Sequence, residues 1–258
     1  MDSAAPAKPQ KNQPKINSMT TTFHLAWKEI RAYFSSWAAY VLCAGWLFLS
    51  GLTFASLLGA NTPGAPFSLA PLYQNLIVIL LFLTPLLTMR LIAEERAGGT
   101  FEMLFTSPLT EWQVTLGKWL GALFFCGFLL VLTLQFPYFV SSYGAGDAAP
   151  TWGAYFALIC LCATFCAFGL LCSSLAESQI VAGFLTFGGL LVSWMLSFLS
   201  AASPESALAS LAGEFSVFPH FARMLGGAID SKDAVFFASL TGFFLYATTR
   251  VLESRKWK

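Results

Sequence analysis

The stretch EERAGGTFEMLFTSPLTEWQVTLGK, residues 94–118, lies between two long apolar segments. Charged residues gather in it, although the chain of 258 residues is 57% hydrophobic and only 10% charged. They are Glu94, Glu95, Arg96, Glu102, Glu111 and Lys118. Because soluble domains carry about 25% charged residues, the composition indicates a membrane protein. The stretch is then a polar connection between membrane-spanning segments.

The uncharged segments on both sides of this connection predict six membrane-spanning helices. No charged residue lies between Arg31 and Arg90, and this interval is too long for one crossing of about 20 residues. Turn-forming residues at 61–66 divide it into two spans. Beyond Lys118, three uncharged intervals and a final apolar segment each hold one helix. The expected fold is an all-α polytopic membrane protein with spans at about 38–59, 69–92, 117–140, 152–175, 179–202 and 234–252.

Two further segments precede the first span. Residues 1–18 are rich in Pro, Lys, Asn and Gln and are expected to form a disordered tail. Residues 19–36 place apolar side chains at helical spacing beside charged ones, which is typical of an amphipathic helix in the membrane interface. An alternative is that they form the first turns of span one. Residues 37–258 are expected to form the transmembrane domain.

The positive charges predict the orientation. Twelve of the 14 Lys and Arg residues lie on the side of the termini, and only Arg223 and Lys232 lie on the other side. Because cytoplasmic loops carry the excess of Lys and Arg, we expect a multi-pass protein of the bacterial inner membrane with both termini in the cytoplasm. The half-apolar segment 203–233 is then outside, where we expect short helices before span six.

The residues that carry chemistry argue against an enzyme. The Gly117-Lys118 pair lacks the upstream glycine and the following Ser or Thr of a phosphate-binding loop, so ATP hydrolysis is not expected in this chain. No catalytic residue, bound cofactor or metal site is predicted, and scattered positive charge gives no reason to expect nucleic acid. We expect interfacial or packing roles for His24 and His220. The Cys162–Cys166 pair suits apolar packing better than a soft metal.

Within the polar connection, helix signals surround an apolar cluster. Gly98-Gly99 ends the preceding helix, and Ser107-Pro108 starts another. Thr110 and Gln113 have the spacing of a capping box, which is a second helix start. The apolar residues between these signals are Phe101, Leu104 and Phe105. A solvated loop explains the charges but not the exposed apolar residues, which a docking surface explains.

These motifs resemble the cytoplasmic loop of ABC-2 type transporter permeases, above all the gliding-motility-associated branch. The similar residues are Glu94-Glu-Arg96, Gly99-Thr-Phe-Glu102, Leu104, Thr106-Ser-Pro-Leu109 and Gly117-Lys118. The N-terminal segment 27–34 and the C-terminal motifs His220-Phe, Gly227-Ala-Ile-Asp230, Asp233 and Leu252-Glu-Ser-Arg255 also resemble that branch.

The resemblance implies a homodimer or heterodimer of permeases that docks on two copies of a separate ABC ATPase, which binds the ATP and Mg²⁺. In that family, the interfacial helix and the loop after span two, with its coupling helix, contact the ATPase. The implied contact residues are Glu94, Glu95, Arg96, Thr100, Phe101, Glu102, Leu104, Ser107, Trp27, Lys28 and Arg31. The implied outer gate residues are Phe218, His220, Phe221 and Asp230.

The leading hypothesis is an ATP-driven exporter permease that is coupled to its ATPase through residues 94–111. The alternative is a membrane scaffold or assembly factor of a gliding or secretion machinery that uses an ABC ATPase and translocates no solute. An intramembrane enzyme is a third and weaker possibility, because no His or charged residue lies inside a predicted span to act as a catalytic base.

Overall fold

The computed structural model describes residues 18–60, 67–99, 110–143, 148–202, 213, 216–226 and 230–255. The regular elements in these ranges are helices. They are α1 (Ser18–Ser35), α2 (Trp37–Ala60), α3 (Ala70–Thr88), α4 (Ala93–Ala97), α6 (Glu111–Thr133), α7 (Gln135–Ser142), α8 (Ala148–Leu175), α9 (Gln179–Ala202), α11 (Val217–Leu225) and α12 (Ser231–Arg255). The expected tail at 1–18 lies, apart from Ser18, outside the described residues.

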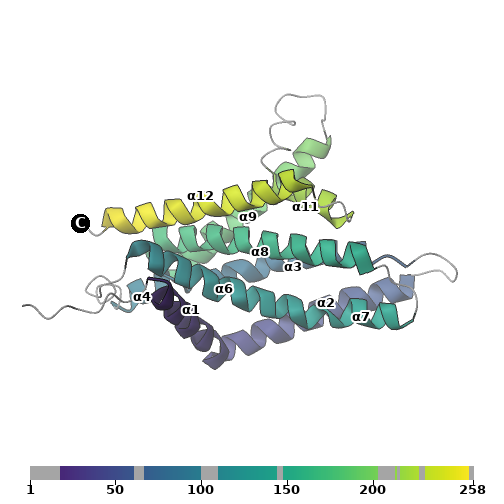
Figure 1. The fold of residues 1–258 in the computed structure, drawn as a ribbon, viewed down its shortest axis with the longest axis horizontal. Coiled ribbons are helices and arrows are strands. Elements are labelled where there is room, and N and C mark those ends of the chain that lie inside the picture. Colours follow the sequence, from purple (N-terminus) through teal and green to yellow (C-terminus); the bar gives the residue numbers. More distant parts are fainter. Residues whose placement is uncertain are drawn as a thin grey trace, which may run out of the picture.

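In the described part of the chain, six helical segments are long and apolar enough to cross a membrane. They are α2, the run from α3 to α4, the run from α6 to α7, α8, α9 and α12. This confirms the predicted all-helical polytopic fold with six spans. Successive spans run in opposite directions, so the bundle has two ends (Figure 1). We call the end with α1, α4 and the end of α12 the near end, and the end with α7 and α11 the far end.

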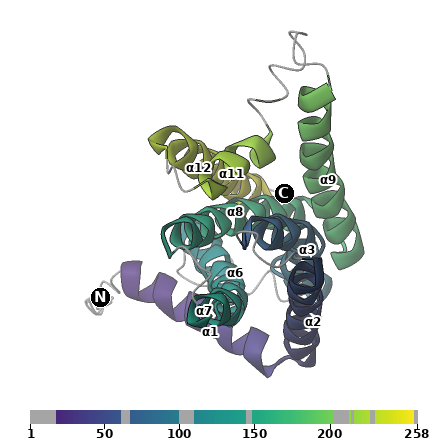
Figure 2. The ribbon, with the colours of Figure 1, turned by 90° about the vertical axis from the view of Figure 1, so that its right-hand side faces the viewer.

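The centre of the bundle is formed by α3 and α8. About two thirds of the most apolar window of each of these spans is buried (67%), against 17% for α2 and for α9. Figure 2 shows α2 and α9 at the periphery. A buried and a half-buried indole tie the bundle together: Trp46 Nε1 donates to the Leu129 carbonyl at 2.8 Å, and Trp119 Nε1 donates to the Ala163 carbonyl at 2.9 Å. Buried indole N–H groups need such partners.

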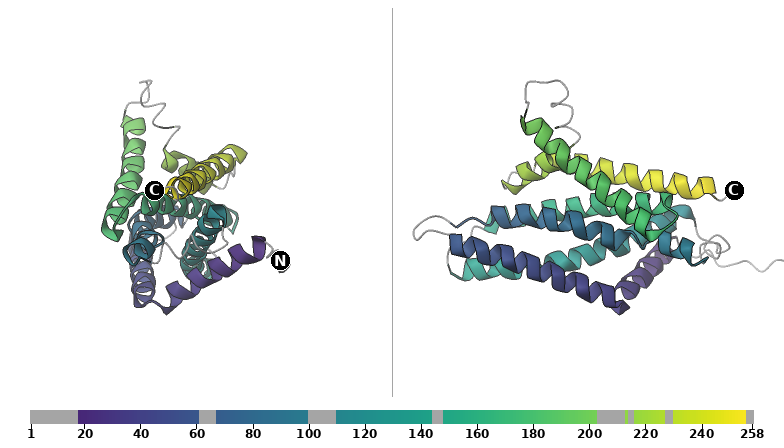
Figure 3. Two further views of the ribbon diagram at one scale, coloured as in Figure 1. Left: turned by 90° about the vertical axis from the view of Figure 1, so that its left-hand side faces the viewer. Right: turned by 180° about the vertical axis from the view of Figure 1, so that it is seen from behind.

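Helix α1 lies across the near end rather than along the bundle axis (Figure 3). It packs mainly against the first half of α6. Its bend into α2 occurs at Ser36, whose backbone N–H donates to the Tyr33 carbonyl at 3.0 Å. Residues 18–35 and 37–60 are therefore two helices with a bend between them, and the location of α1 in the membrane interface stays a prediction.

Candidate functional site

A buried lysine joins three elements at the near end. The Lys118 side chain of α6 is 1% exposed, and its Nζ lies 2.9 Å from Glu29 Oε1 of α1 and 2.8 Å from Glu95 Oε1 of α4. A buried ammonium is stable only with charged, hydrogen-bonded partners. Because the two carboxylates come from different elements, the ion pairs hold α1 and α4 onto the start of span three. We call Lys118, Glu29 and Glu95 the near-end junction.

The local sequence of α6 explains how Glu29 reaches Lys118. Thr110 and Gln113 form the predicted capping box, which is confirmed, and it fixes the start of α6 two turns before Lys118. Gly117 and Gly121 face α1: an added Cβ would lie 2.8 Å from Leu25 Cδ2 and 2.7 Å from Glu29 Cβ. Only glycine therefore lets α1 lie this close, and the close approach brings the Glu29 carboxylate to the lysine.

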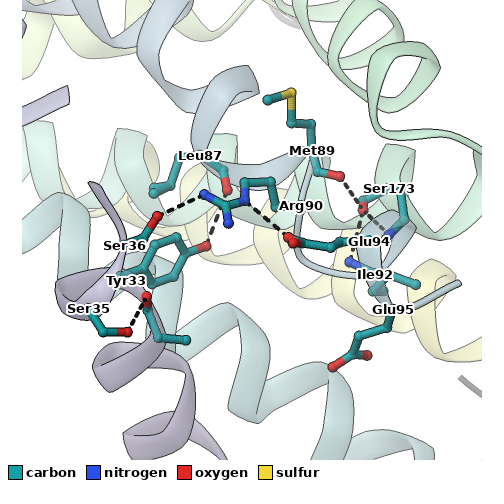
Figure 4. Close-up of polar contacts among 12 residues, drawn as sticks. Tyr33, Ser35, Ser36, Leu87, Met89, Arg90, Ile92, Glu94, Glu95 and Ser173 are labelled. Carbon is teal, nitrogen blue, oxygen red and sulfur yellow. Dashed lines mark hydrogen bonds and ion pairs between the residues drawn. The ribbon is translucent and has the colours of Figure 1, made fainter. Parts of the chain in front are cut away.

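The segment that precedes α4 is bound to the end of α8. The Ser173 hydroxyl accepts hydrogen bonds from the backbone N–H groups of Ile92 and Ala93, both at 3.1 Å, and donates to the Met89 carbonyl at 3.3 Å (Figure 4). Arg96 Nη1 donates to the Ala176 carbonyl at 3.1 Å. The backbone N–H groups at the start of a short helix are thus paired, and α4 is attached to both α6 and α8.

A second polar group connects the α1–α2 bend with the end of α3. Arg90 Nε lies 3.0 Å from Glu94 Oε2, and Arg90 Nη1 donates to Ser36 Oγ at 3.2 Å (Figure 4). Tyr33 Oη donates to the Leu87 carbonyl at 3.2 Å. Burial, followed by the nearby Glu29 carboxylate, raises the pKa of the Tyr33 phenol well above its usual value, so the phenol remains a neutral donor.

These contacts surround a small pocket of about 60 Å³ at the near end. Its walls are Glu29, Ala32, Tyr33, Arg90, Leu91 and Glu94. The carboxylates of Glu29 and Glu94 make the pocket acidic, but each is already paired with a cation inside the chain. The pocket is therefore a gap in the joint between α1 and the α3–α4 connection.

The predicted ATPase-contact residues divide into three groups. Glu94 and the α1 residues Trp27, Lys28 and Arg31 are exposed, and the Arg31 guanidinium lies 5.4 Å from the centre of the Trp27 ring. In contrast, Glu95 and Arg96 are half-buried and make internal contacts. The remaining predicted contact residues, Thr100, Phe101, Glu102, Leu104 and Ser107, lie outside the described residues.

Two members of the near-end junction were missed by the sequence analysis. It counted Lys118 as one of the cytoplasmic positive charges and treated Glu29 as part of the polar face of α1. The available signal was the Gly117-x-x-x-Gly121 spacing, which allows a close helix approach, directly beside the first lysine of an apolar helix.

At the far end, the predicted gate residues take different positions. Phe221 is fully buried, Phe218 is half-buried, and Asp230 is exposed and caps α12 by accepting the Lys232 N–H at 3.2 Å. His220 has more than a packing role: its Nδ1 lies 2.7 Å from Asp233 Oδ1. This contact was not predicted from the sequence, because Asp233 lies 13 residues away on another helix.

The thiols of the bundle lie in its core. Cys126 Sγ of α6 lies 3.6 Å from Cys166 Sγ of α8, and both residues and Cys162 are fully buried. Among the described residues, no group of three or more His, Cys, Asp or Glu side chains is arranged to hold a metal ion. The cysteines of α6 and α8 act as small apolar side chains in a tight helix contact.

The six spans and the polar near end define a multi-pass membrane protein with a charged joint at one end of its bundle. Residues 12–214 match the family described as ABC-2 family transporter protein, so the chain belongs to this family of transporter permeases. Part of the chain is also similar to the "Probable multidrug ABC transporter permease YbhR" of Escherichia coli K12 and of Escherichia coli O157:H7. It is 34% identical to each over 88 residues, which cover 34% of this chain and 23% of the relative.

Proposed function

We propose that this chain is the permease subunit of an ATP-driven exporter and that a separate ABC ATPase docks on its near end. The observation that carries this proposal is the near-end junction. Lys118 binds both segments that the family resemblance assigns to ATPase contact, α1 through Glu29 and α4 through Glu95. A push on either segment is therefore transmitted directly to span three, because a buried ion pair is costly to break.

The orientation and the subunit composition follow from this proposal. Of the nine Lys and Arg residues that the structure describes, seven lie at the near end, so this end faces the cytoplasm, where ATP is present. Two copies of the chain, identical or closely related, pair in the inner membrane and bind two ATPase subunits with their ATP and Mg²⁺. Within the family, the resemblance of the motifs around residues 94–118 and 220–233 supports assignment to the gliding-motility-associated branch.

The cargo that fits best is an amphipathic or lipid-linked molecule. In the described membrane-spanning helices, Asp, Glu, Lys and Arg residues lie only in the segments at the two ends of the bundle. At the near end they lie within 90–96, 111–118 and 250–255, and at the far end they are Lys232 and Asp233. Charged residues normally mark ion pathways, so this path suits apolar cargo. The relatives in E. coli are described as probable multidrug permeases, which supports export of such molecules.

A charge reversal on the exposed part of the site tests the docking. Glu94 is half-exposed and Glu95 points inward, so Glu94→Arg changes the docking surface and leaves the near-end junction intact. We expect the variant to insert normally and to lose most co-purification with its partner ABC ATPase. Glu177→Arg is the matched control, because Glu177 is an exposed carboxylate in the α8–α9 turn at the same end. Equal ATPase binding by the parent chain, Glu94→Arg and Glu177→Arg would refute docking at α4.

A membrane scaffold that uses an ATPase without moving a solute is the second candidate. It is favoured by the resemblance to gliding-motility permeases, and it needs the same docking. Uptake of a fluorescent amphipathic probe into sealed inverted vesicles separates the two functions. ATP-dependent accumulation that Glu94→Arg abolishes supports export. Intact ATPase coupling without accumulation of any probe supports the scaffold.

A further inference from the structure

Three charged or titratable side chains meet at the far end, between α11 and α12. Asp233 lies in the first turn of α12 and is 1% exposed. Arg223 Nη2 lies 2.7 Å from its Oδ1, and Arg223 Nε lies 3.4 Å from its Oδ2. His220 Nδ1 lies 2.7 Å from the same Oδ1 atom. The two partners of this buried carboxylate therefore come from one face of α11.

The contacts of His220 Nδ1 cannot all be favourable at once. This nitrogen also lies 2.7 Å from Arg223 Nη2. A guanidinium nitrogen only donates and a carboxylate oxygen only accepts, whereas an imidazole nitrogen does one or the other. Without a proton, Nδ1 accepts from Arg223 and repels Asp233. With a proton, Nδ1 donates to Asp233 and opposes Arg223. The proton on Nδ1 therefore selects which residue of α11 holds the carboxylate.

The surroundings favour such an exchange of partners. The His220 ring is stacked on Phe236 of α12, with ring centres 3.9 Å apart, so it stays beside Asp233 in either state. The Arg223 side chain is 57% exposed, so its guanidinium can exchange this contact for water. Of the other elements that pack against α11, α8 and α3 carry only phenols and thiols, and α9 has no ionisable side chain. Lys232 and Asp230 beside the cluster are exposed.

We propose that Arg223 and His220 are alternating partners of Asp233, that the proton on His220 Nδ1 decides which of them holds the carboxylate, and that either contact keeps α11 on α12. When Nδ1 carries a proton, His220 holds the carboxylate, and when it does not, Arg223 holds it. Imidazole is the side chain that ordinarily changes its charge between about pH 5 and 8. With two partners, Asp233 thus stays bound to α11 over a pH range in which a histidine ordinarily loses its charge.

The contact between Asp233 and α11 is important because α11 packs on several spans at the far end. Val217, Phe221, Met224 and Leu225 are buried, and α11 packs on α8, α9, α12 and α3. Figure 2 faces the far end and shows α11 beside α12, on the side toward α9. Release of Asp233 would loosen a helix that contacts four spans. This role as a positioning device at the outer gate rests on the proposed function, because that proposal places the far end outside the cell.

The test follows the mobility of α11 with a nitroxide at the exposed position Ala222→Cys. Spectra are recorded in lipid nanodiscs at about pH 5.5 and about pH 8, and the chain without Ala222→Cys gives the background from native cysteines. With His220 and Arg223 both present, we expect an immobile label at both pH values. With Arg223→Gln, we expect an immobile label in acid and a mobile fraction that is roughly tenfold larger in alkali, because a neutral imidazole is a weaker partner than an imidazolium.

Two further variants make the result decisive. His220→Gln leaves Arg223 on the carboxylate, so its label should be immobile at both pH values. The double variant His220→Gln/Arg223→Gln should be mobile at both. A label in Arg223→Gln that is equally mobile or equally immobile at the two pH values overturns the proposal. The spectra require neither the ATPase nor a transported molecule, so their outcome is independent of the docking experiment.

Discussion

Lys118 is almost completely shielded from water, and two carboxylates from distant parts of the chain compensate its charge. Lys118→Met keeps the length of the side chain and removes the charge, which leaves two partly buried carboxylates facing each other. Removing one partner of a buried ion pair typically costs about 3 kcal/mol or more. We expect the melting temperature of the purified protein in detergent to fall by several degrees.

A compensated variant separates charge from packing. In Glu29→Gln/Glu95→Gln/Lys118→Met, no carboxylate is left unpaired, so we expect part of the lost stability to return. Lys28→Met is the control, because Lys28 lies beside Glu29 but is exposed. It should melt like the parent protein. A Lys118→Met protein that melts at the parent temperature would show that the near-end junction contributes nothing to stability.

The different contacts of Glu94 and Glu95 could not be predicted from the sequence. The two residues are neighbours of the same type, and the sequence analysis assigned both to one surface. In the structure, Glu95 reaches the buried lysine, whereas Glu94 pairs with Arg90 near the surface. The difference depends on where α6 passes α4, and Lys118 is 23 residues away from Glu95 along the chain. Local composition does not contain this information.

The contact between α1 and α6 depends on the absence of two side chains. An added Cβ at Gly121 would lie 2.7 Å from Glu29 Cβ, closer than packed carbon atoms come. Gly121→Ala should push α1 away from α6 and cost about 1–3 kcal/mol, the usual effect of overpacking. We expect faster hydrogen exchange in α1, measured by mass spectrometry, together with a lower melting temperature.

Gly127→Ala is a matched control on the same helix. An added Cβ at Gly127 meets no atom within 4 Å, so the substitution tests alanine in α6 without a clash. It should leave exchange in α1 unchanged. If both substitutions speed exchange in α1 to the same extent, the close approach at Gly121 does not hold the two helices together.

The start of a helix could be predicted where a local sequence signal marks it, but contacts between helices could not be predicted. The start of α6 follows from Thr110 and Gln113, whose side chains and backbone groups satisfy each other within one turn. The attachment of α4 to Ser173 and the pairing of His220 with Asp233 join different helices. Ser173 sits in an apolar helix like many other serines, and only the packing of α3 on α8 gives it its partners.

For the whole molecule, the arrangement of six spans was predictable because burying a charge in lipid is costly. Uncharged intervals had to be spans, and the charges between them had to be at the ends. Which spans form the centre could not be predicted in this way. All six are apolar around most of their surface, yet α3 and α8 are central and α2 and α9 are peripheral. The composition of a segment shows whether it lies in the membrane or in water. It does not show whether a membrane-spanning helix faces lipid or another helix.

The orientation of the bundle can be measured directly. Ser178 is exposed in the α8–α9 turn at the near end, and Ala222 is exposed on α11 at the far end. We expect a membrane-impermeant maleimide to label Ala222→Cys in intact cells and Ser178→Cys only after the membrane is permeabilised. The physical reason is the bias of Lys and Arg toward the near end, which resists translocation. The parent chain is the blank, since its cysteines lie within the spans. The reverse labelling pattern would place the near-end junction outside the cell, away from ATP, and would exclude ATPase coupling through α1 and α4.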